Sequence, residues 1–448
     1  MVMAEGVRRS EIVTRLLAWL AESRYQWCWL NGDLHLPERI DSDLDMLVGS
    51  GEGGDFLRDV AGLDDMLVVQ LRHYEARSWA VVVTSRRDRS VTLQLDVSED
   101  VRGGGVIFYR AAELLPYRKH CAGGGYCLPP ALEFCQYLFK HAMKSRRLRL
   151  DRLQDRVLQR LRQLYRSDPP GCRAEMQRKF DPLTVMQVSR CFDTHDDNAF
   201  PPLRSVAGRL RRDFVRHSPW TVATYYRQEW RRLAGRVRRC NGVFVVIMGC
   251  DGAGKSRVIA GLQETLPGVV TGVRSRHFRF HRRHRGDAAA VTRPHGRPPR
   301  PVWLTNLKLL AWWGNYWLGY WLHVRPATCR GEAFFFDRYG FDAFVDPRRY
   351  RIGRLTAFQR RVLMTIPRPD AVIVLDVDPV TLAARSRDDV APSCRKELVM
   401  RYRDWCARAP LPCHRIEAAG PLEAVIDRVR TVVQDVLGRR TESLLGGL

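Results

Sequence analysis

Strand-like and helix-like patterns of apolar residues alternate along the second half of the chain. Short apolar runs predict strands at residues 243–248, 269–273, 332–337, 371–377 and 413–416. Helical spacing separates these runs; after the first, for example, Val258, Ile259 and Leu262 share one face. Because strands that alternate with helices build parallel sheets, the pattern predicts an α/β domain with a doubly wound parallel sheet over residues 241–448.

The first half of the chain has a different pattern. An amphipathic helix is expected at residues 10–20, and β-rich runs predict strands at residues 27–30, 41–48 and 91–97. From Leu128 onward the spacing becomes helical, with a basic amphipathic segment at residues 145–165. We therefore expect an α+β domain at residues 1–118 and a helical region at residues 119–240, ahead of the α/β domain.

A glycine-rich turn connects the first strand of the α/β domain to the helix that follows it. The turn consists of Gly249, Cys250, Asp251, Gly252, Ala253, Gly254, Lys255 and Ser256, and it fits G-x-x-x-x-G-K-[ST] at every fixed position. Its glycines let backbone N–H groups converge on phosphate oxygens, and the helix N-terminus adds its dipole. We expect Lys255 to reach the β- and γ-phosphates and Ser256 to bind Mg²⁺. The turn therefore predicts binding of a nucleoside triphosphate such as ATP.

Three acidic residues stand out in the first 118 residues. Asp43 and Asp45 fall on the same face of one predicted strand, and Asp96 lies on a later one between apolar neighbours. Two carboxylates on one strand face are costly unless cations or other partners lie between them. These residues are candidate metal ligands, and turn or edge chemistry is the alternative explanation.

This arrangement resembles the nucleotidyltransferase superfamily, which has a glycine turn, a D-x-D strand and a third Asp on a later strand. The resemblance implies that Asp43, Asp45 and Asp96 hold two Mg²⁺ ions for nucleotidyl transfer. Asp33, however, follows Gly32 where that superfamily usually has Gly or Ser. A degenerate site kept as a binding module therefore remains open as an alternative.

The segments GCDGAGKS, FFFDRY and AVIVLDVDPVTLAARSRDD, in that order, resemble thymidylate kinase and its nucleoside monophosphate kinase relatives over residues 242–437. The resemblance implies that Asp251 contacts the acceptor, that Asp337 serves Mg²⁺ and the reacting phosphates, and that Arg338 binds the acceptor phosphate. It also implies that Arg385 and Arg387 close over the transferred phosphoryl group as lid arginines.

The whole chain is similar to thymidylate-kinase-like proteins with a nucleotidyltransferase-like front half, a group associated with bacterial surface-polysaccharide gene clusters. True thymidylate kinases carry R-E-P-G-G-T after their second strand, where this chain has HFRFHRRH. We therefore expect ATP and Mg²⁺ at the phosphate loop, with a nucleotide, a polysaccharide-related phosphate or a lipid-linked phosphate as the acceptor.

The net charge of +25 is compatible with two interpretations. Arginine supplies 67 of the 74 basic residues. Such a skew fits both a compositional bias with solvated arginine faces and a true anionic partner such as nucleic acid.

Residues 303–324 are rich in aromatic and aliphatic side chains, but Asn306, Lys308, Asn315 and His323 interrupt them. We expect a largely buried helix with peripheral membrane contact and no transmembrane span. The twelve cysteines contain no C-x-x-C pair, which predicts free thiols in a cytoplasmic protein. We also expect a homodimer.

These observations predict an ATP·Mg²⁺-dependent phosphotransferase similar to thymidylate kinase. Two alternatives belong to other functional classes. One is an NTP-binding regulatory or nucleic-acid-associated protein, and the other is a nucleotidyltransferase that acts through the first 118 residues.

Overall fold

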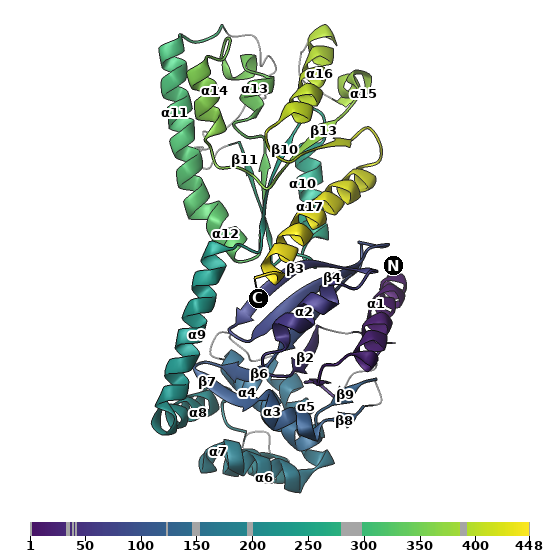
Figure 1. Cartoon of the computed structure of the whole chain (residues 1–448), viewed down its shortest axis with the longest axis vertical. Helices are drawn as coiled ribbons and strands as arrows, with labels where there is room; N and C mark the ends of the chain where they lie inside the picture. Colours follow the sequence, from purple (N-terminus) through teal and green to yellow (C-terminus); the bar gives the residue numbers. More distant parts are fainter. Residues whose placement is uncertain are drawn as a thin grey trace. The chain divides into compact units, whose positions relative to one another are not determined.

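The structure is a computed structural model, and it describes residues 2–32, 36–37, 40, 43–121, 124–145, 153–194, 200–278, 298–385 and 392–447. The chain forms two compact units (Figure 1). The first unit comprises Met1–Arg238 together with Leu444–Leu448, and the second comprises Arg239–Ser443. The helices expected at residues 119–240 belong, up to Arg238, to the first unit.

A mixed β-sheet forms the centre of the first unit. Its strands are β1 (Trp27–Trp29), β2 (Leu44–Val48), β3 (Met66–Glu75), β4 (Ser78–Ser85), β5 (Thr92–Ser98), β8 (Lys119–His120) and β9 (Tyr126–Cys127). In the described part of the chain they follow the order β3-β4-β5-β2-β1-β9-β8, with β2 parallel to β5. The β2–β5 register places Asp45 directly beside Asp96. The strands β6 (Asp100–Gly103) and β7 (Val106–Arg110) form a separate antiparallel ribbon.

Helices cover this sheet and form a second apolar cluster beside it. They are α1 (Val2–Glu22), α2 (Gly53–Ala61), α3 (Ala111–Leu114), α4 (Pro130–Ser145), α5 (Leu153–Ser167), α6 (Pro169–Lys179), α7 (Pro182–Thr194), α8 (Leu203–His217) and α9 (Pro219–Arg238), with a 3₁₀ turn at Leu115–Tyr117. Apolar residues of α1 pack on the sheet because they recur at helical spacing, as Val13, Leu16 and Leu20 do. The fully buried Phe134 and Phe139 of α4 pack in the cluster formed with α5 to α8.

A five-stranded, fully parallel sheet forms the centre of the second unit in the residues that the structure describes. Its strands are β10 (Val243–Met248), β11 (Val273–His277), β12 (Ala333–Asp337), β13 (Ala371–Asp376) and β14 (Cys413–Glu417). Their order is β11-β12-β10-β13-β14: from the central β10 the chain goes to the edge strand β11, returns to β12 beside β10, and then adds β13 and β14 on the other side. All six residues of β10 are buried, as expected for the central strand of a parallel sheet. The predicted doubly wound parallel sheet is therefore present.

The position predicted for the second of these strands was wrong. Residues 269–273 were expected to be extended, but β11 begins only at Val273. Val269 and Val270 instead form a buried turn after the preceding helix, in which both backbone N–H groups donate to the Leu266 carbonyl oxygen. These apolar residues are thus buried by a turn and not by strand pairing.

Helices lie on both faces of the second sheet (Figure 1). They are α10 (Lys255–Thr265), α11 (Val302–Gly319), α12 (Arg325–Cys329), α13 (Asp342–Val345), α14 (Ala357–Met364), α15 (Pro379–Arg385), α16 (Pro392–Arg408) and α17 (Leu422–Leu445), with a π-helical turn at Tyr320–Val324 and a 3₁₀ turn at Arg348–Tyr350. A reciprocal cap between Thr356 and Gln359 begins α14. No helix among the described residues combines the length and the hydropathy needed to cross a bilayer.

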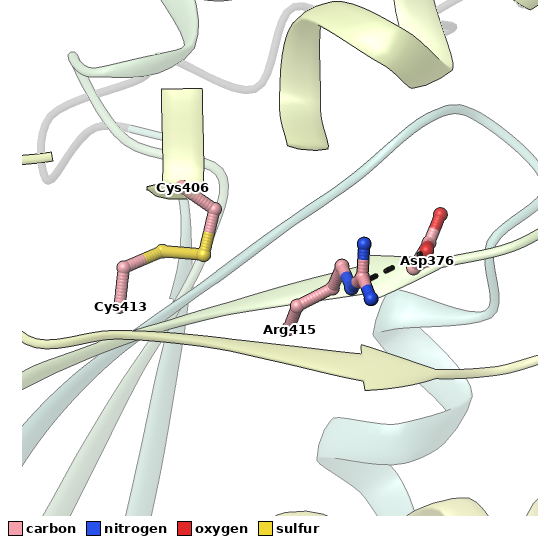
Figure 2. The surroundings of a disulfide bond; sticks show 4 residues. All are labelled: Asp376, Cys406, Cys413 and Arg415. Carbon is pink, nitrogen blue, oxygen red and sulfur yellow. Dashed lines mark ion pairs between the residues drawn. A yellow bond between two sulfur atoms is a disulfide. The ribbon is translucent and has the colours of Figure 1, made fainter. Parts of the chain in front are cut away.

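The expectation that all cysteines are free thiols was also wrong. Cys406 in the last turn of α16 and Cys413 at the start of β14 form a disulfide (Figure 2). The return of the chain from helix to strand brings their Cα atoms to 5.5 Å, which is within the range that a disulfide spans. Spacing in the sequence did not reveal the bond, because it depends on that tight return.

Candidate functional site

The glycine-rich loop joins the central strand β10 to helix α10 and needs its glycines for two different reasons. Gly249 has a φ of 143°, and a Cβ atom there would lie 2.8 Å from the carbonyl oxygen of Leu375 on β13. Gly254, the N-cap of α10, has a φ of 87° in the left-handed region. Both conformations disfavour larger residues, so the loop's path depends on these two positions.

Helix α10 begins where the loop ends. No side chain caps it, since its N-cap is Gly254. The first-turn N–H groups of a helix have no intrahelical acceptor, and they carry the positive end of its dipole. The loop and helix therefore present backbone donors at one place, an arrangement suited to phosphate oxygens.

Lys255 is the first residue of α10, and its side chain is only 7% exposed. Its ammonium group donates hydrogen bonds to the carbonyl oxygens of Gly249 (2.9 Å) and Cys250 (2.8 Å), within the loop itself. Burial, reinforced by the positive charge of Arg338, lowers the pKa of Lys255 to about 8. The lysine is thus held over the loop as a cation with few water contacts.

Ser256 and Asp337 meet beside this lysine. Asp337 ends β12, the neighbour of β10, and the Ser256 hydroxyl donates to its Oδ2 at 2.7 Å. His277 on β11 places Nδ1 at 3.5 Å from the same oxygen. Burial alone would raise the pKa of Asp337, but the contacts with His277, Lys255 and Ser256 outweigh it and lower the pKa.

The residues present fit a magnesium ion at this place. The other carboxylate oxygen of Asp337, Oδ1, is buried and has no hydrogen-bond partner within the described part of the chain. A buried oxygen of this kind normally has a partner. A serine hydroxyl and an acidic oxygen are both hard ligands, of the kind that Mg²⁺ prefers.

Two arginines bind the acidic residue of the loop. Arg338 and Arg349 form ion pairs with Oδ1 and Oδ2 of Asp251, respectively. Arg338 is buried and has a φ of 68°, a strained conformation for a residue with a side chain. Its backbone N–H donates to the carbonyl oxygen of Ile247 at 3.0 Å, which holds it beside β10. The resulting Arg–Asp–Arg cluster lies at the loop.

Arg349 and the polar residues behind the cluster were not predicted from the sequence. Fully buried Asp342 accepts hydrogen bonds from the Tyr402 hydroxyl (2.6 Å) and the Tyr339 N–H (3.1 Å), and burial raises its pKa. The Tyr350 hydroxyl is buried and has no hydrogen-bond partner among the described residues. The only sequence signal for these residues is the run of polar and aromatic residues after the strand that ends in Asp337.

Of the two expected lid arginines, the structure describes only Arg385. Arg385, the last residue of α15, donates from Nη1 to the Ala418 carbonyl oxygen (3.0 Å) and from Nη2 to that of Ala419 (2.8 Å). It is thus bound to the segment after β14 in this structure. Arg387 lies outside the described residues. The structure therefore brings together Lys255, Ser256, Asp337, Asp251 and Arg338, but it does not add Arg385 to their contacts.

The three carboxylates of the first unit form contacts with polar groups of the chain itself. Lys140 on α4 places its Nζ 2.6 Å from Oδ1 of Asp45, and the Asn31 amide donates to Oδ2 at 3.1 Å. The Gln94 amide nitrogen lies 2.9 Å from Oδ2 of Asp43 and 2.9 Å from Oδ1 of Asp96. Burial, and secondarily the charge of Asp45, raises the pKa of Asp96 to about 6 and also raises that of Asp43.

No three acidic, histidine or cysteine residues among those described lie close enough together to form a metal site. Two of the three carboxylates, those of Asp45 and Asp96, instead border a cavity of about 590 Å³ within the first unit. Its lining includes Asp45, Asp96, Lys140 and Lys144, with aromatic side chains contributed by Trp79, Tyr225 and Tyr226. The cavity is therefore large enough for a small organic ligand.

No protein-family model matches the chain, and no curated protein does. Among solved structures, the chain is similar to the structure of deoxyadenosine kinase from M. mycoides with bound dATP. That similarity has a TM-score of 0.30 at 14% sequence identity, and it covers 42% of this chain and 98% of the kinase. A likeness this weak supports no functional conclusion.

Proposed function

We propose that the second unit is an ATP- and Mg²⁺-dependent phosphotransferase of the thymidylate-kinase-like type, whose acceptor is a nucleotide or a polysaccharide-related phosphate. One observation carries the proposal. Ser256 and Asp337 meet at the start of α10, and the carboxylate oxygen of Asp337 left over from that hydrogen bond is buried without a described partner. This pair, next to a glycine loop and a buried lysine, has the composition expected of a site for a triphosphate and its cation.

The backbone of the loop, Lys255, and the Ser256–Asp337 pair have distinct parts in the proposed reaction. Backbone N–H groups of the loop and of α10 would bind phosphate oxygens, and Lys255 would exchange its carbonyl partners in the loop for them. Ser256 and Asp337 would hold Mg²⁺, which supplies charge neutralisation at the reacting phosphates. Phosphoryl transfer requires little covalent chemistry from the protein, so positioned positive charge supplies most of the rate.

The Arg338–Asp251–Arg349 cluster is the proposed acceptor site. A guanidinium group has five N–H donors, and a carboxylate accepts only some of them. Arg338 and Arg349 therefore retain donors for an acceptor phosphate while Asp251 orients them. A fixed, paired arrangement of this kind limits the reorganisation needed when the acceptor binds.

The proposal is tested with purified protein, ATP and Mg²⁺ against a panel of nucleoside monophosphates, sugar phosphates and phosphorylated glycolipids. Mass spectrometry should find an acceptor that gains one phosphoryl group, together with ADP, and the Asp337→Asn variant should form less of this product at the same Mg²⁺ concentration. Turnover of thymidylate alone would exclude the polysaccharide-related acceptor. Failure to form any product, together with failure to bind ATP, would contradict the phosphotransferase itself.

A second candidate function rests on the cavity of the first unit. We propose that this cavity binds a nucleotide, either as a binding module or for nucleotidyl transfer at Asp43, Asp45 and Asp96. Transfer with Mg²⁺ would require the ions to displace Lys140 from Asp45 and Gln94 from the other two carboxylates. Pyrophosphate released from a nucleoside triphosphate, and lost in Asp45→Asn but not in Lys255→Ala, would support transfer; nucleotide binding without pyrophosphate would support the binding module.

A further inference from the structure

Helix α11 and the π-helical turn after it are apolar on two opposite faces. Leu309, Trp312 and Tyr316 form the buried face. The expectation that residues 303–324 form a largely buried helix was wrong, because the opposite face is also apolar and is exposed. A helix on the surface of a globular unit normally carries polar residues on its solvent side, so this second apolar face requires an explanation.

The outer face of α11 is defined here by the large apolar residues between 302 and 322 that are 38% to 65% exposed. They are Val302, Trp303, Leu304, Leu307, Leu310, Trp313, Leu318, Trp321 and Leu322. Trp303, Leu307, Leu310, Leu318 and Trp321 follow helical spacing, so they form a stripe and not scattered exposures. The eighteen residues of α11 alone give the stripe a length of about 27 Å. A contiguous apolar surface of this extent usually marks an interaction site.

The chain segments that form and flank this apolar stripe carry basic residues and no acidic ones. Residues 298–331 contain no Asp or Glu, and neither do residues 347–369, which carry seven arginines. The second of these segments includes α14, which lies beside α11 (Figure 1) and places Arg360 and Arg361 at the surface. The surface is thus apolar at its centre and cationic at its side.

We propose that the outer face of α11 binds the headgroup region of an anionic lipid bilayer, with the helix lying parallel to the membrane surface. Tryptophan combines a large apolar ring with a polar N–H group, and it prefers the boundary between headgroups and acyl chains. The neighbouring arginines would be attracted by anionic headgroups. Apolar burial and charge attraction together are what hold a helix at a membrane surface.

A second copy of the chain fits this face less well. In a two-fold symmetric dimer the same surface would meet itself. The acid-free segments at residues 298–331 and 347–369 would then oppose each other, with no carboxylate in either segment to compensate their arginines. Charge complementarity therefore favours the anionic bilayer.

Hydrogen bonds from residues outside the outer face hold α11 in the second unit. Hydrogen bonds connect α11 to its surroundings from Lys308 to the Tyr350 carbonyl oxygen, from Trp317 to that of Thr365, and between the amide groups of Asn306 and Gln359. None of these contacts involves the exposed leucines. Substitutions on the outer face should therefore leave the fold intact.

Flotation of the full-length protein with phosphatidylcholine vesicles, with and without phosphatidylglycerol, tests the proposal. We expect binding only to the anionic vesicles. The double variant Leu307→Glu/Leu318→Glu should lower the partition coefficient by about tenfold or more. Arg360→Gln/Arg361→Gln should lower it by about fivefold for each arginine that lies at the membrane surface.

A matched control places two glutamates on an exposed apolar surface of the first unit. Leu183→Glu/Met186→Glu changes residues of α7 that are 46% and 59% exposed, and it should leave vesicle binding unchanged. Thermal unfolding confirms that each variant is folded. Absence of flotation, equal binding to neutral vesicles, or equal loss in the α7 variant would overturn the proposal. So would a fall in solution mass of Leu307→Glu/Leu318→Glu, which would assign the face to a second copy.

Discussion

Asp337 in the second unit and Asp45 in the first lie on strands of their sheets with a lysine nearby, but their oxygens have different partners. Asp337 accepts one hydrogen bond from Ser256, and its second oxygen has no described partner, while Lys255 is bonded to loop carbonyls. Asp45 has Lys140 on one oxygen and Asn31 on the other. In the first unit, a lysine of the chain thus compensates the charge of Asp45. In the second unit, one oxygen of Asp337 is left as an acceptor for an external cation.

The largest expected effect follows from removing the lysine of the second unit. Lys255→Ala should lower the rate of phosphoryl transfer by about a hundredfold to a thousandfold, because a positioned cation at the phosphates is lost. Initial rates with the acceptor identified from the panel measure the effect. Lys140→Ala is the matched control, and an equal loss of rate in that variant would contradict the distinction between the two units.

A smaller effect is expected at the carboxylate. Asp337→Asn should raise the Mg²⁺ concentration needed for half-maximal rate by about tenfold or more, because an anionic ligand becomes a neutral amide. The amide retains an oxygen for the Ser256 hydroxyl, so the fold should be preserved. Rates measured over a magnesium titration give this concentration in both proteins. An unchanged Mg²⁺ concentration at half-maximal rate would show that Asp337 does not bind the cation.

The glycine loop was predictable because its chemistry is local. The loop, Lys255 and Ser256 fall within eight consecutive residues, and the strand before them and helix after them are strongly periodic. Asp337 was predictable as well, because the end of a buried strand in a parallel sheet is close to the loop of its neighbour.

The contacts that distinguish the two units could not be predicted, because they depend on how distant segments pack. Lys140 meets Asp45 across 95 residues of chain, when α4 packs beside the sheet. Arg349 meets Asp251 across 98 residues, through a loop with no regular period. The Cys406–Cys413 bond depends on the path of the chain between α16 and β14. Spacing in the sequence contains none of this information.

Removing the lysine of the first unit should leave a carboxylate oxygen there without its cation, as Asp337 has in the second unit. Lys140→Ala leaves the partly buried Asp45 without its cation, and should lower the free energy of unfolding by about 1–2 kcal/mol. Because the freed oxygen can accept a metal, Mn²⁺ should restore part of that loss. Urea unfolding with and without Mn²⁺ measures both effects, and Lys144→Ala provides the control. A variant as stable as the original chain would show that Lys140 does not compensate Asp45.

The smallest expected effect comes from an ion pair away from both sites. Glu332 directly precedes β12 and pairs with Arg274 and Arg330. Burial alone would raise its pKa, but these arginines lower it. Glu332→Gln should lower the free energy of unfolding by about 0.5–1 kcal/mol at neutral pH. A lowered carboxylate pKa stabilises the fold above the unfolded pKa, and the contribution is lost as pH falls through the folded pKa. The difference between the two proteins should therefore vanish in acid, and a difference that grows in acid would contradict this assignment.

We propose that phosphoryl transfer from ATP to the acceptor depends on the glycine loop of the second unit and not on the carboxylates of the first. Mass spectrometry of products from ATP, Mg²⁺ and the acceptor panel, run in parallel on Lys255→Ala and Asp45→Asn, tests it most directly. We predict that the phosphorylated product disappears in Lys255→Ala and persists in Asp45→Asn. The reverse pattern, in which Asp45→Asn loses the product and Lys255→Ala retains it, would contradict the claim.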